Sequence, residues 1–228
     1  SFSHNGKYYD IPAHTVHRGK ILEDITLVPR PLKLPVDCWQ PMAGGSQRGM
    51  DFMAKNGIKG VVAGGTAPGG SAEITARHWQ NTLKKSGREV AFGEDLAIAL
   101  QIHIADTEEK AIREAEPFFQ EQIKVLAPLG RFPKLTEEQI HATFDPYLAP
   151  LANLPTLKDA VKDGSWLCGP PEHIAEKIAD LLDRFPNIER VSVGSGALGI
   201  PLSVIRDDVR RFGDEILPKF ADETVLFD

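Results

Sequence analysis

An almost uninterrupted apolar run, LAIALQIHIAD at residues 96–106, constrains the fold more than any other stretch. Such a run is typical of a strand in a parallel sheet that is covered on both faces. Shorter apolar runs at residues 36–43, 58–65 and 189–197 end in or are followed by glycines, and a helical pattern comes after each. Strands that alternate with helices pair in parallel through right-handed crossovers, so the sequence predicts an α/β fold with four convincing strands.

The same patterns divide the chain into segments of a single domain. Aromatic residues and prolines punctuate the start, and the turn-forming pair Asn5-Gly6 indicates a hairpin or a wrapping loop there. The expected segments are a connecting segment (1–35), βα units (36–116), a helical insertion (117–164), and the last βα unit with a C-terminal helix (165–220).

Two serines and one proline set the expected helix boundaries. Ser46 occupies an N-cap position before an amphipathic pattern that ends at Gly57, and Ser71 can cap a helix over about residues 72–86. Pro117 lacks an amide donor and clashes with the preceding turn, so the helix before it should kink or end there.

Composition excludes several classes of protein. The formal net charge is −6, and the densest basic runs are the pairs Lys84-Lys85 and Arg210-Arg211, which argues against a nucleic-acid surface. No apolar stretch approaches the roughly 20 residues that span a bilayer, and no signal-peptide pattern opens the chain. We expect a cytoplasmic protein that binds neither nucleic acid nor membrane.

Cysteine and histidine usage points away from metal or nucleophilic chemistry. Cys38 and Cys168 both lie in apolar sequence, so we interpret them as reduced core thiols rather than as a disulfide or a zinc site. No G-x-S-x-G motif occurs, and neither cysteine has a histidine or basic residue close by in the sequence. No partners at metal-ligand spacing accompany His14, His17, His78, His141 or His173, so no metal is assigned. Any chemistry is therefore expected to depend on a bound cofactor.

The stretch WQPMAGGSQRGMDFMAKNG, residues 39–57, joins an apolar run to a helix through Gly44, Gly45 and Ser46. A glycine turn that leads into a serine-capped helix brings free amides and the positive end of the helix dipole together, which suits a phosphate. Arg48 adds positive charge. The pattern alone leaves a second interpretation open, in which Ser46 simply caps its own helix.

Two further glycine-rich turns, AGGTAPGGS at residues 63–71 and GSGALGIP at residues 194–201, also follow strands. Turns after the strands of α/β folds are where ligands bind, so both are candidate anion sites of weaker pattern. His103 and Gln101 are two residues apart in a strand and therefore share a face. His103 is interpreted as a core histidine with satisfied hydrogen bonds, with a proton-donor role as the alternative.

Several stretches, taken in order, resemble the luciferase-like flavin-dependent monooxygenases. They are HNGKYYDI, PRPLKLPVDCWQPMAGGSQRGMDFMAKNGIKGVV, IADTEEKAIREA, CGPPEHIAEKI and RFGDEILPKF. Singly these are loose, but as an ordered set over nearly the whole chain they are fairly specific.

The resemblance implies a (β/α)₈ barrel of the TIM-barrel type, of which this chain holds the second half, about four parallel strands with their helices. It also implies that Ala43, Gly44, Gly45, Ser46 and the Gln47 amide contact the phosphate of a flavin. The family elements that bind the flavin ring, and the histidine usually discussed in catalysis, fall in the other half. No catalytic residue is therefore assigned.

The function implied by the resemblance is oxygenation of a small organic substrate by reduced FMN and O₂. The alternatives are a deazaflavin (F420)-dependent oxidoreductase of the same superfamily and a non-catalytic flavin-binding protein. The expected partners are the substrate, O₂, a flavin reductase, and either a second copy of the chain or the other half of the barrel, because a parallel half-barrel would leave unpaired strand edges.

Overall fold

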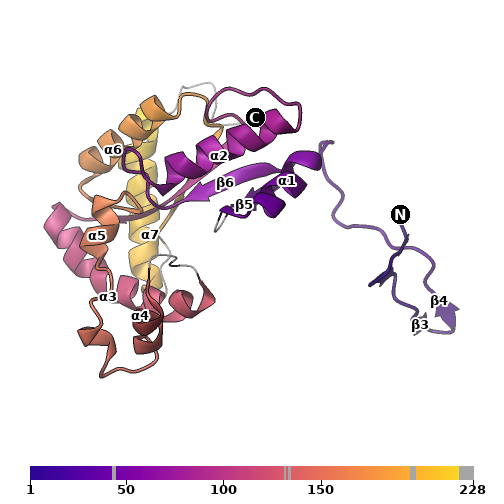
Figure 1. The fold of residues 1–228 in the computed structure, drawn as a ribbon, viewed down its shortest axis with the longest axis horizontal. Helices are drawn as coiled ribbons and strands as arrows, with labels where there is room; N and C mark the ends of the chain where they lie inside the picture. Colours follow the sequence, from indigo (N-terminus) through magenta and orange to yellow (C-terminus); the bar gives the residue numbers. More distant parts are fainter. Residues whose placement is uncertain (43–44, 131, 133–134, 196–198, 221–228) are drawn as a thin grey trace. The chain divides into compact units, whose positions relative to one another are not determined.

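The computed structural model describes residues 1–42, 45–130, 132, 135–195 and 199–220 (Figure 1). Two compact units make up the chain, Ser1–Asp37 and Cys38–Asp228. The first unit consists of two short antiparallel hairpins. The Gly6 amide donates to the Tyr9 carbonyl at 3.0 Å and so closes the turn indicated by Asn5-Gly6. The hairpin strands are β1 (His4–Asn5) with β2 (Asp10–Ile11), and β3 (Val16–His17) with β4 (Lys20–Ile21).

The second unit is built on a parallel sheet of five strands, which confirms the predicted α/β class. The strands are β5 (Trp39–Pro41), β6 (Lys59–Ala63), β7 (Leu96–Ile104), β8 (Trp166–Gly169) and β9 (Arg190–Gly194). The helices are α1 (Gln47–Lys55), α2 (Ser71–Lys85), α3 (Glu108–Leu126), α4 (Glu137–Ala142), α5 (Leu157–Lys162), α6 (Pro171–Arg184) and α7 (Leu202–Arg211). Shorter turns are η2 (Ala127–Leu129), η3 (Ala149–Leu151), η4 (Phe212–Ile216) and η5 (Leu217–Lys219).

Strand β7 lies at the centre of the sheet and pairs with three others. Ala97 pairs with both Val61 of β6 and Arg190 of β9, so these two strands lie on opposite edges of β7. Gln101 pairs with both Trp166 of β8 and Gly194 of β9. Strands β6 and β8 therefore share one edge of β7, the first along its amino-terminal half and the second along its carboxy-terminal half.

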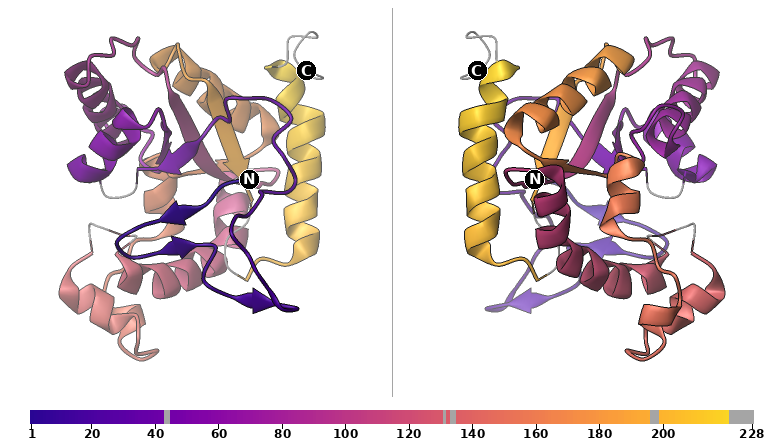
Figure 2. Two further views of the ribbon diagram at one scale, coloured as in Figure 1. Left: turned by 90° about the vertical axis from the view of Figure 1, so that its right-hand side faces the viewer. Right: turned by 90° about the vertical axis from the view of Figure 1, so that its left-hand side faces the viewer.

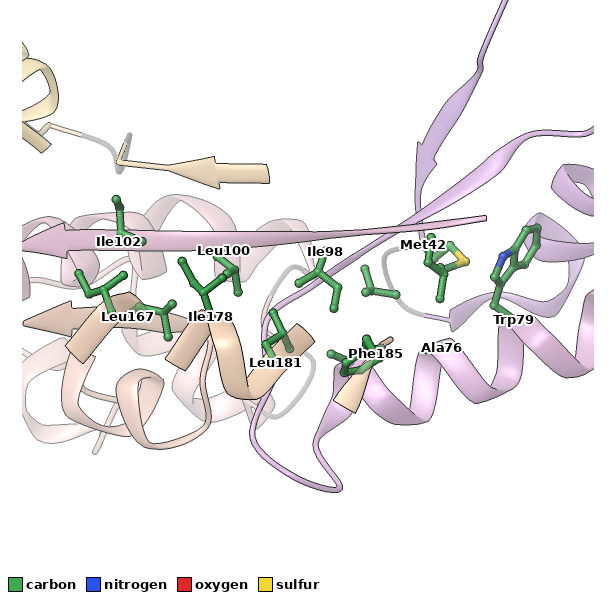
Figure 3. Packing of buried hydrophobic residues seen from close by; sticks show 14 of the residues in the cluster. Met42, Ala76, Trp79, Ile98, Leu100, Ile102, Leu167, Ile178, Leu181 and Phe185 are labelled. Carbon is green, nitrogen blue, oxygen red and sulfur yellow. The ribbon is translucent and has the colours of Figure 1, made fainter. Parts of the chain in front are cut away.

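Apolar side chains form two clusters, one on each face of this sheet. The larger cluster takes alternate residues of β7 and packs them against α1, α2 and α6. Figure 3 shows part of it, with Ile98 and Leu100 on the side of Ile178 and Leu181, and with Trp79 beside Met42. The smaller cluster contains Trp166 and Cys168 of β8 and packs against α3 and α5. In Figure 2 the strands lie between these helices, with α7 in yellow beside the sheet.

The right-handedness of crossover connections explains why α3 lies on the opposite face of the sheet from α2 and α6. The connection from β6 to β7 and the connection from β8 to β9 run in one direction across the sheet, and their helices α2 and α6 share a face. The connection from β7 to β8 runs in the opposite direction. A right-handed crossover then requires α3 to lie on the other face, which is where the smaller cluster places it.

The structure differs from the sequence predictions in three elements. Strand β8 is a fifth strand beside the four predicted. Helix α3 continues past Pro117 to Leu126 instead of ending there. Helix α2 begins at Ser71 itself, after the N-cap Gly70, so Ser71 is not the capping residue.

Candidate functional site

The site predicted from the first glycine turn lies at the amino end of α1, after β5. Ser46 is the N-cap, with extended backbone angles and a side chain that accepts from the Gly49 amide at 3.4 Å. Gly45 has a φ of +60°, a left-handed conformation that favours glycine. Ala43 and Gly44 lie outside the described residues. The predicted helix, its cap and its end near Gly57 are confirmed.

The amino end of α1 has hydrogen-bond donors and positive charge that its own side chains do not neutralise. The amides of Gln47 and Arg48 belong to the first turn, where an α-helix supplies no acceptor from within. This turn contains no acidic residue, as in α7, whereas α2 through α6 each have at least one in their first turn. Arg48 is exposed. The end of α1 can therefore accept an external anion.

The side chain of Gln47 fixes α1 against α2. Its amide nitrogen donates to Asp51 Oδ1 at 2.7 Å and to Thr82 Oγ1 at 3.1 Å, and its Oε1 lies 2.6 Å from His78 Nε2. Thr82 is buried. Only the backbone amide of Gln47 is left to face a ligand, which is the part of this residue that the family motif implies. The contribution of His78 was not visible in the sequence, because it stands 31 positions away.

The second glycine turn, after β6, is closed by hydrogen bonds of its own. The Gly65 amide donates to Ser165 Oγ at 2.9 Å, and the Ala67 amide donates to the Asp163 carbonyl at 3.0 Å. The Gly69 amide donates to a carboxylate oxygen of Glu73 at 3.1 Å. These amides are committed to protein acceptors, so they do not form the backbone anion site that the sequence pattern allowed.

His103 is buried and hydrogen-bonded, as the core interpretation predicts. Its Nδ1 lies 3.0 Å from Asp208 Oδ2 and its Nε2 lies 3.3 Å from Glu114 Oε2. Burial lowers the pKa of His103, but the two carboxylates outweigh burial and leave that pKa above its ordinary value. Asp208 also accepts from Ser195 Oγ and the Ile104 amide, so it joins α7 to β7 and to the turn after β9.

The two cysteines differ in their surroundings. Cys168 is buried in β8, and burial raises the pKa of its thiol to about 12, which leaves it protonated and unreactive at neutral pH. Cys38 is exposed, so its interpretation as a core thiol is wrong. It lies just before β5, where its side chain is outside both apolar clusters. Within the described residues, no group of three or more His, Cys, Asp or Glu side chains could hold a metal ion.

Comparison with known proteins identifies the family. A family model described as luciferase-like monooxygenase matches residues 2–186. The chain belongs to the luciferase-like monooxygenase family. Among curated proteins, none matches this luciferase-like chain with significant similarity. None of its helices, over the part of the chain that the structure describes, is long and apolar enough to cross a membrane.

Solved structures of luciferase-like enzymes share the fold at low sequence identity. Monooxygenase RslO1 from Streptomyces bottropensis aligns with a TM-score of 0.59 at 16% identity, covering 91% of this chain and 56% of that one. The oxygenating constituent of 3,6-diketocamphane monooxygenase from Pseudomonas putida, solved with FMN, aligns with a TM-score of 0.58 at 19% identity, covering 96% and 58%. The F420-dependent tetrahydromethanopterin reductase from Methanopyrus kandleri aligns with a TM-score of 0.53 at 16% identity, covering 80% and 50%.

This luciferase-like chain therefore spans little more than half the length of the structures that it matches. The likeness establishes an α/β fold that corresponds to part of a TIM-barrel enzyme. Of these structures, one was solved in complex with FMN and another is described as F420-dependent.

Proposed function

We propose that the amino end of α1 binds the phosphate of a flavin, and that the protein is an FMN-dependent monooxygenase. The observation that carries the proposal is the N-terminal turn of α1, where Ser46, the Gln47 and Arg48 amides and a left-handed Gly45 meet without an acidic side chain. Within the described part of the chain, a Cβ at Gly45 would have no atom within 4 Å, which leaves room for a ligand to approach this backbone closely.

Ser46 has the freedom to serve a ligand as well as its helix. Its Oγ accepts from Gly49 at 3.4 Å, a long bond, and its hydroxyl proton remains available for donation to an anion. The Gln47 and Arg48 amides would donate to other phosphate oxygens, and the Arg48 guanidinium would add charge. By the family motif, the proposed set of phosphate-binding residues also includes Ala43 and Gly44. The hydrogen bonds from the Gln47 side chain to Thr82 and His78 hold the start of α1 against α2.

The proposed reaction is the oxygenation of a small organic substrate. A bound reduced flavin would supply the electrons that activate O₂. Residues of this chain would anchor and orient the cofactor through its phosphate. The proposed partners are the substrate, O₂, a flavin reductase and a second copy of the chain, and the proposed location is the cytoplasm.

A deazaflavin is the alternative cofactor, and it is favoured by the F420-dependent reductase among the similar structures. Oxygen consumption coupled to reduced FMN would support the monooxygenase, whereas hydride transfer with F420 and no oxygen consumption would support the alternative. Tight FMN binding without either turnover would identify a non-catalytic flavin-binding protein.

The test of the phosphate site is Ser46→Ala, followed by titration with FMN and with riboflavin, which lacks the phosphate. Loss of one charge-assisted hydrogen bond should weaken FMN binding by about 1–3 kcal/mol and leave riboflavin binding unchanged. Thr107→Ala is the matched control, because Thr107 caps α3 in the same way, accepting from the Lys110 amide. FMN affinity that is equal in Ser46→Ala and Thr107→Ala would remove Ser46 from the site.

A further inference from the structure

A hollow of about 270 Å³ lies between the second glycine turn, the end of α5 and the exposed side of α6. This volume falls at the lower edge of the roughly 300–1,000 Å³ typical of pockets for larger organic ligands, so it suits a small one. The lining residues that matter for a ligand include Thr66, Lys162, Gly164, Lys177, Asp180 and Arg184.

The charged groups around this hollow are mostly positive, although the chain as a whole is acidic. Lys162, Lys177 and Arg184 line it together with a single carboxylate, Asp180. Within the described part of the chain, neither Lys162 nor Lys177 forms an ion pair with a carboxylate. Both lysines are exposed, so their ammonium groups can turn towards a ligand in the hollow.

The Arg184 guanidinium also lines the hollow, and only part of it has hydrogen-bond acceptors within the described chain. Its Nη2 donates to the Thr66 carbonyl at 2.6 Å, whereas its Nη1 is buried and has no hydrogen-bond partner among the residues that the structure describes. The Arg184 charge already acts on the Glu73 carboxylate, whose pKa is lowered mainly by Arg77 and to a smaller extent by Arg184. A buried N–H of a guanidinium without an acceptor is nevertheless costly, and an anion at Nη1 reduces that cost. The Thr66 bond holds Arg184 at the rim of the glycine turn, where its field adds to that of the lysines.

The backbone of the turn does not provide the donors. The amides of Gly65, Ala67 and Gly69 already donate to Ser165, Asp163 and Glu73. Recognition in the hollow therefore depends on side-chain cations. We propose that the hollow beside α6 is a second anion site, which binds a small oxyanion of phosphate size through Lys162, Lys177 and Arg184. This site uses none of the residues at the end of α1 and does not depend on the proposed function.

The test is a titration of the ¹⁵N-labelled full chain with inorganic phosphate at constant ionic strength, followed by NMR. Saturable shifts are expected at the amides of Thr66, Gly164 and Lys177. Lys177→Glu should weaken phosphate binding about fivefold or more, because it replaces attraction by repulsion at one exposed position. Lys177 is exposed, so this variant keeps the fold intact. Lys85→Glu, an equal charge change at the end of α2 and outside the hollow, should bind phosphate like the parent chain.

Two outcomes would overturn the inference. Equal phosphate affinity in Lys177→Glu and Lys85→Glu, or shifts that do not saturate, would show only general attraction to basic side chains. Saturable shifts confined to the Gln47 and Arg48 amides, and abolished by Ser46→Ala, would place the phosphate at α1 instead. That second result would refute the hollow as a site while supporting the proposed function, so the two proposals fail separately.

Discussion

The glycine turns after β5 and after β6 look alike in sequence and differ in structure. Each follows a parallel strand and leads into a helix that begins at or beside a serine. After β5, the residues at the start of α1, Ser46, Gln47 and Arg48, are exposed. After β6, the turn is packed against the residues before β8, and its amides donate to Ser165, Asp163 and Glu73.

The contrast shows that glycines alone do not make an anion site. Glycine permits a tight turn, and the turn can then serve either a ligand or the packing of the protein. What decides is whether acceptors from elsewhere in the chain reach the amides. In the second turn two acceptors, Ser165 and Asp163, come from about 100 residues away in the sequence, and the third, Glu73, lies four residues from Gly69. The groups near this turn that can attract an anion are therefore lysine and arginine side chains.

The largest expected difference between the turns is their tolerance of a methyl group. A Cβ at Gly70 would lie 2.2 Å from the Gly65 carbonyl oxygen and 2.7 Å from that of Ala67, so backbone must move. We expect Gly70→Ala to lower the free energy of unfolding by about 3 kcal/mol. Gly45→Ala meets no atom within 4 Å and should cost about 1 kcal/mol for its left-handed backbone. Urea unfolding measures both, and equal losses would contradict the contrast.

A smaller difference in the free energy of unfolding should follow from removing the serine hydroxyl that accepts an amide hydrogen bond near each turn, Ser165 or Ser46. Ser165→Ala leaves the amide of the buried Gly65 without an acceptor, which should cost about 2 kcal/mol. Ser46→Ala removes a 3.4 Å bond at an exposed cap that water can replace, so we expect about 0.5 kcal/mol. The same unfolding measurement tests this order. A larger loss in Ser46→Ala would show that the first turn is also a packing element.

The smallest expected effect is a pH dependence that belongs to neither turn but to the turn after β9. Ser195 there donates to Asp208, which faces His103, whose pKa is raised. A raised pKa contributes stability that is fully present below the ordinary value of 6.5 and is lost as pH rises through the folded-state value. The free energy of unfolding should therefore be highest below the ordinary His103 pKa of 6.5 and should fall as the pH rises through its raised folded-state pKa.

The matched variant for this pH effect is His103→Gln, which can still donate a hydrogen bond to Asp208 but does not titrate. Its unfolding free energy should lack the decline seen in the parent chain. If both chains decline equally over that range, another group is responsible. Gly70→Ala should keep the decline, because its turn has no part in the His103 contacts.

The sequence predicted those helices and strands whose position depends on nearby residues. The cap at Ser46, the central strand β7 and helix α6 were all found from capping residues and apolar periodicity. The phosphate site itself stays a prediction. Strand β8 was missed because four residues are too few to show a period, and its place in the sheet depends on pairing with β7.

Other features depend on contacts that no local pattern contains. Helix α3 runs through Pro117 because Ala111, Ala115, Phe119 and Ile123 bury one continuous face, which offsets the roughly 3 kcal/mol that proline costs in a helix. The contact of His103 with Asp208 spans 105 residues. The bond from Arg184 to Thr66 spans 118, so the cations beside the second turn could not be inferred from the glycines.

The central position of β7 has a consequence during protein synthesis. Residues 96–104 leave the ribosome long before residues 190–194, which complete the second edge of this strand. Until β9 arrives, a strongly apolar strand has a free edge open to other chains. Pairing of such distant segments is also slow. This edge of β7 therefore stays open to pairing with other chains throughout the translation of the intervening residues, even when α2 has already covered one face of the strand.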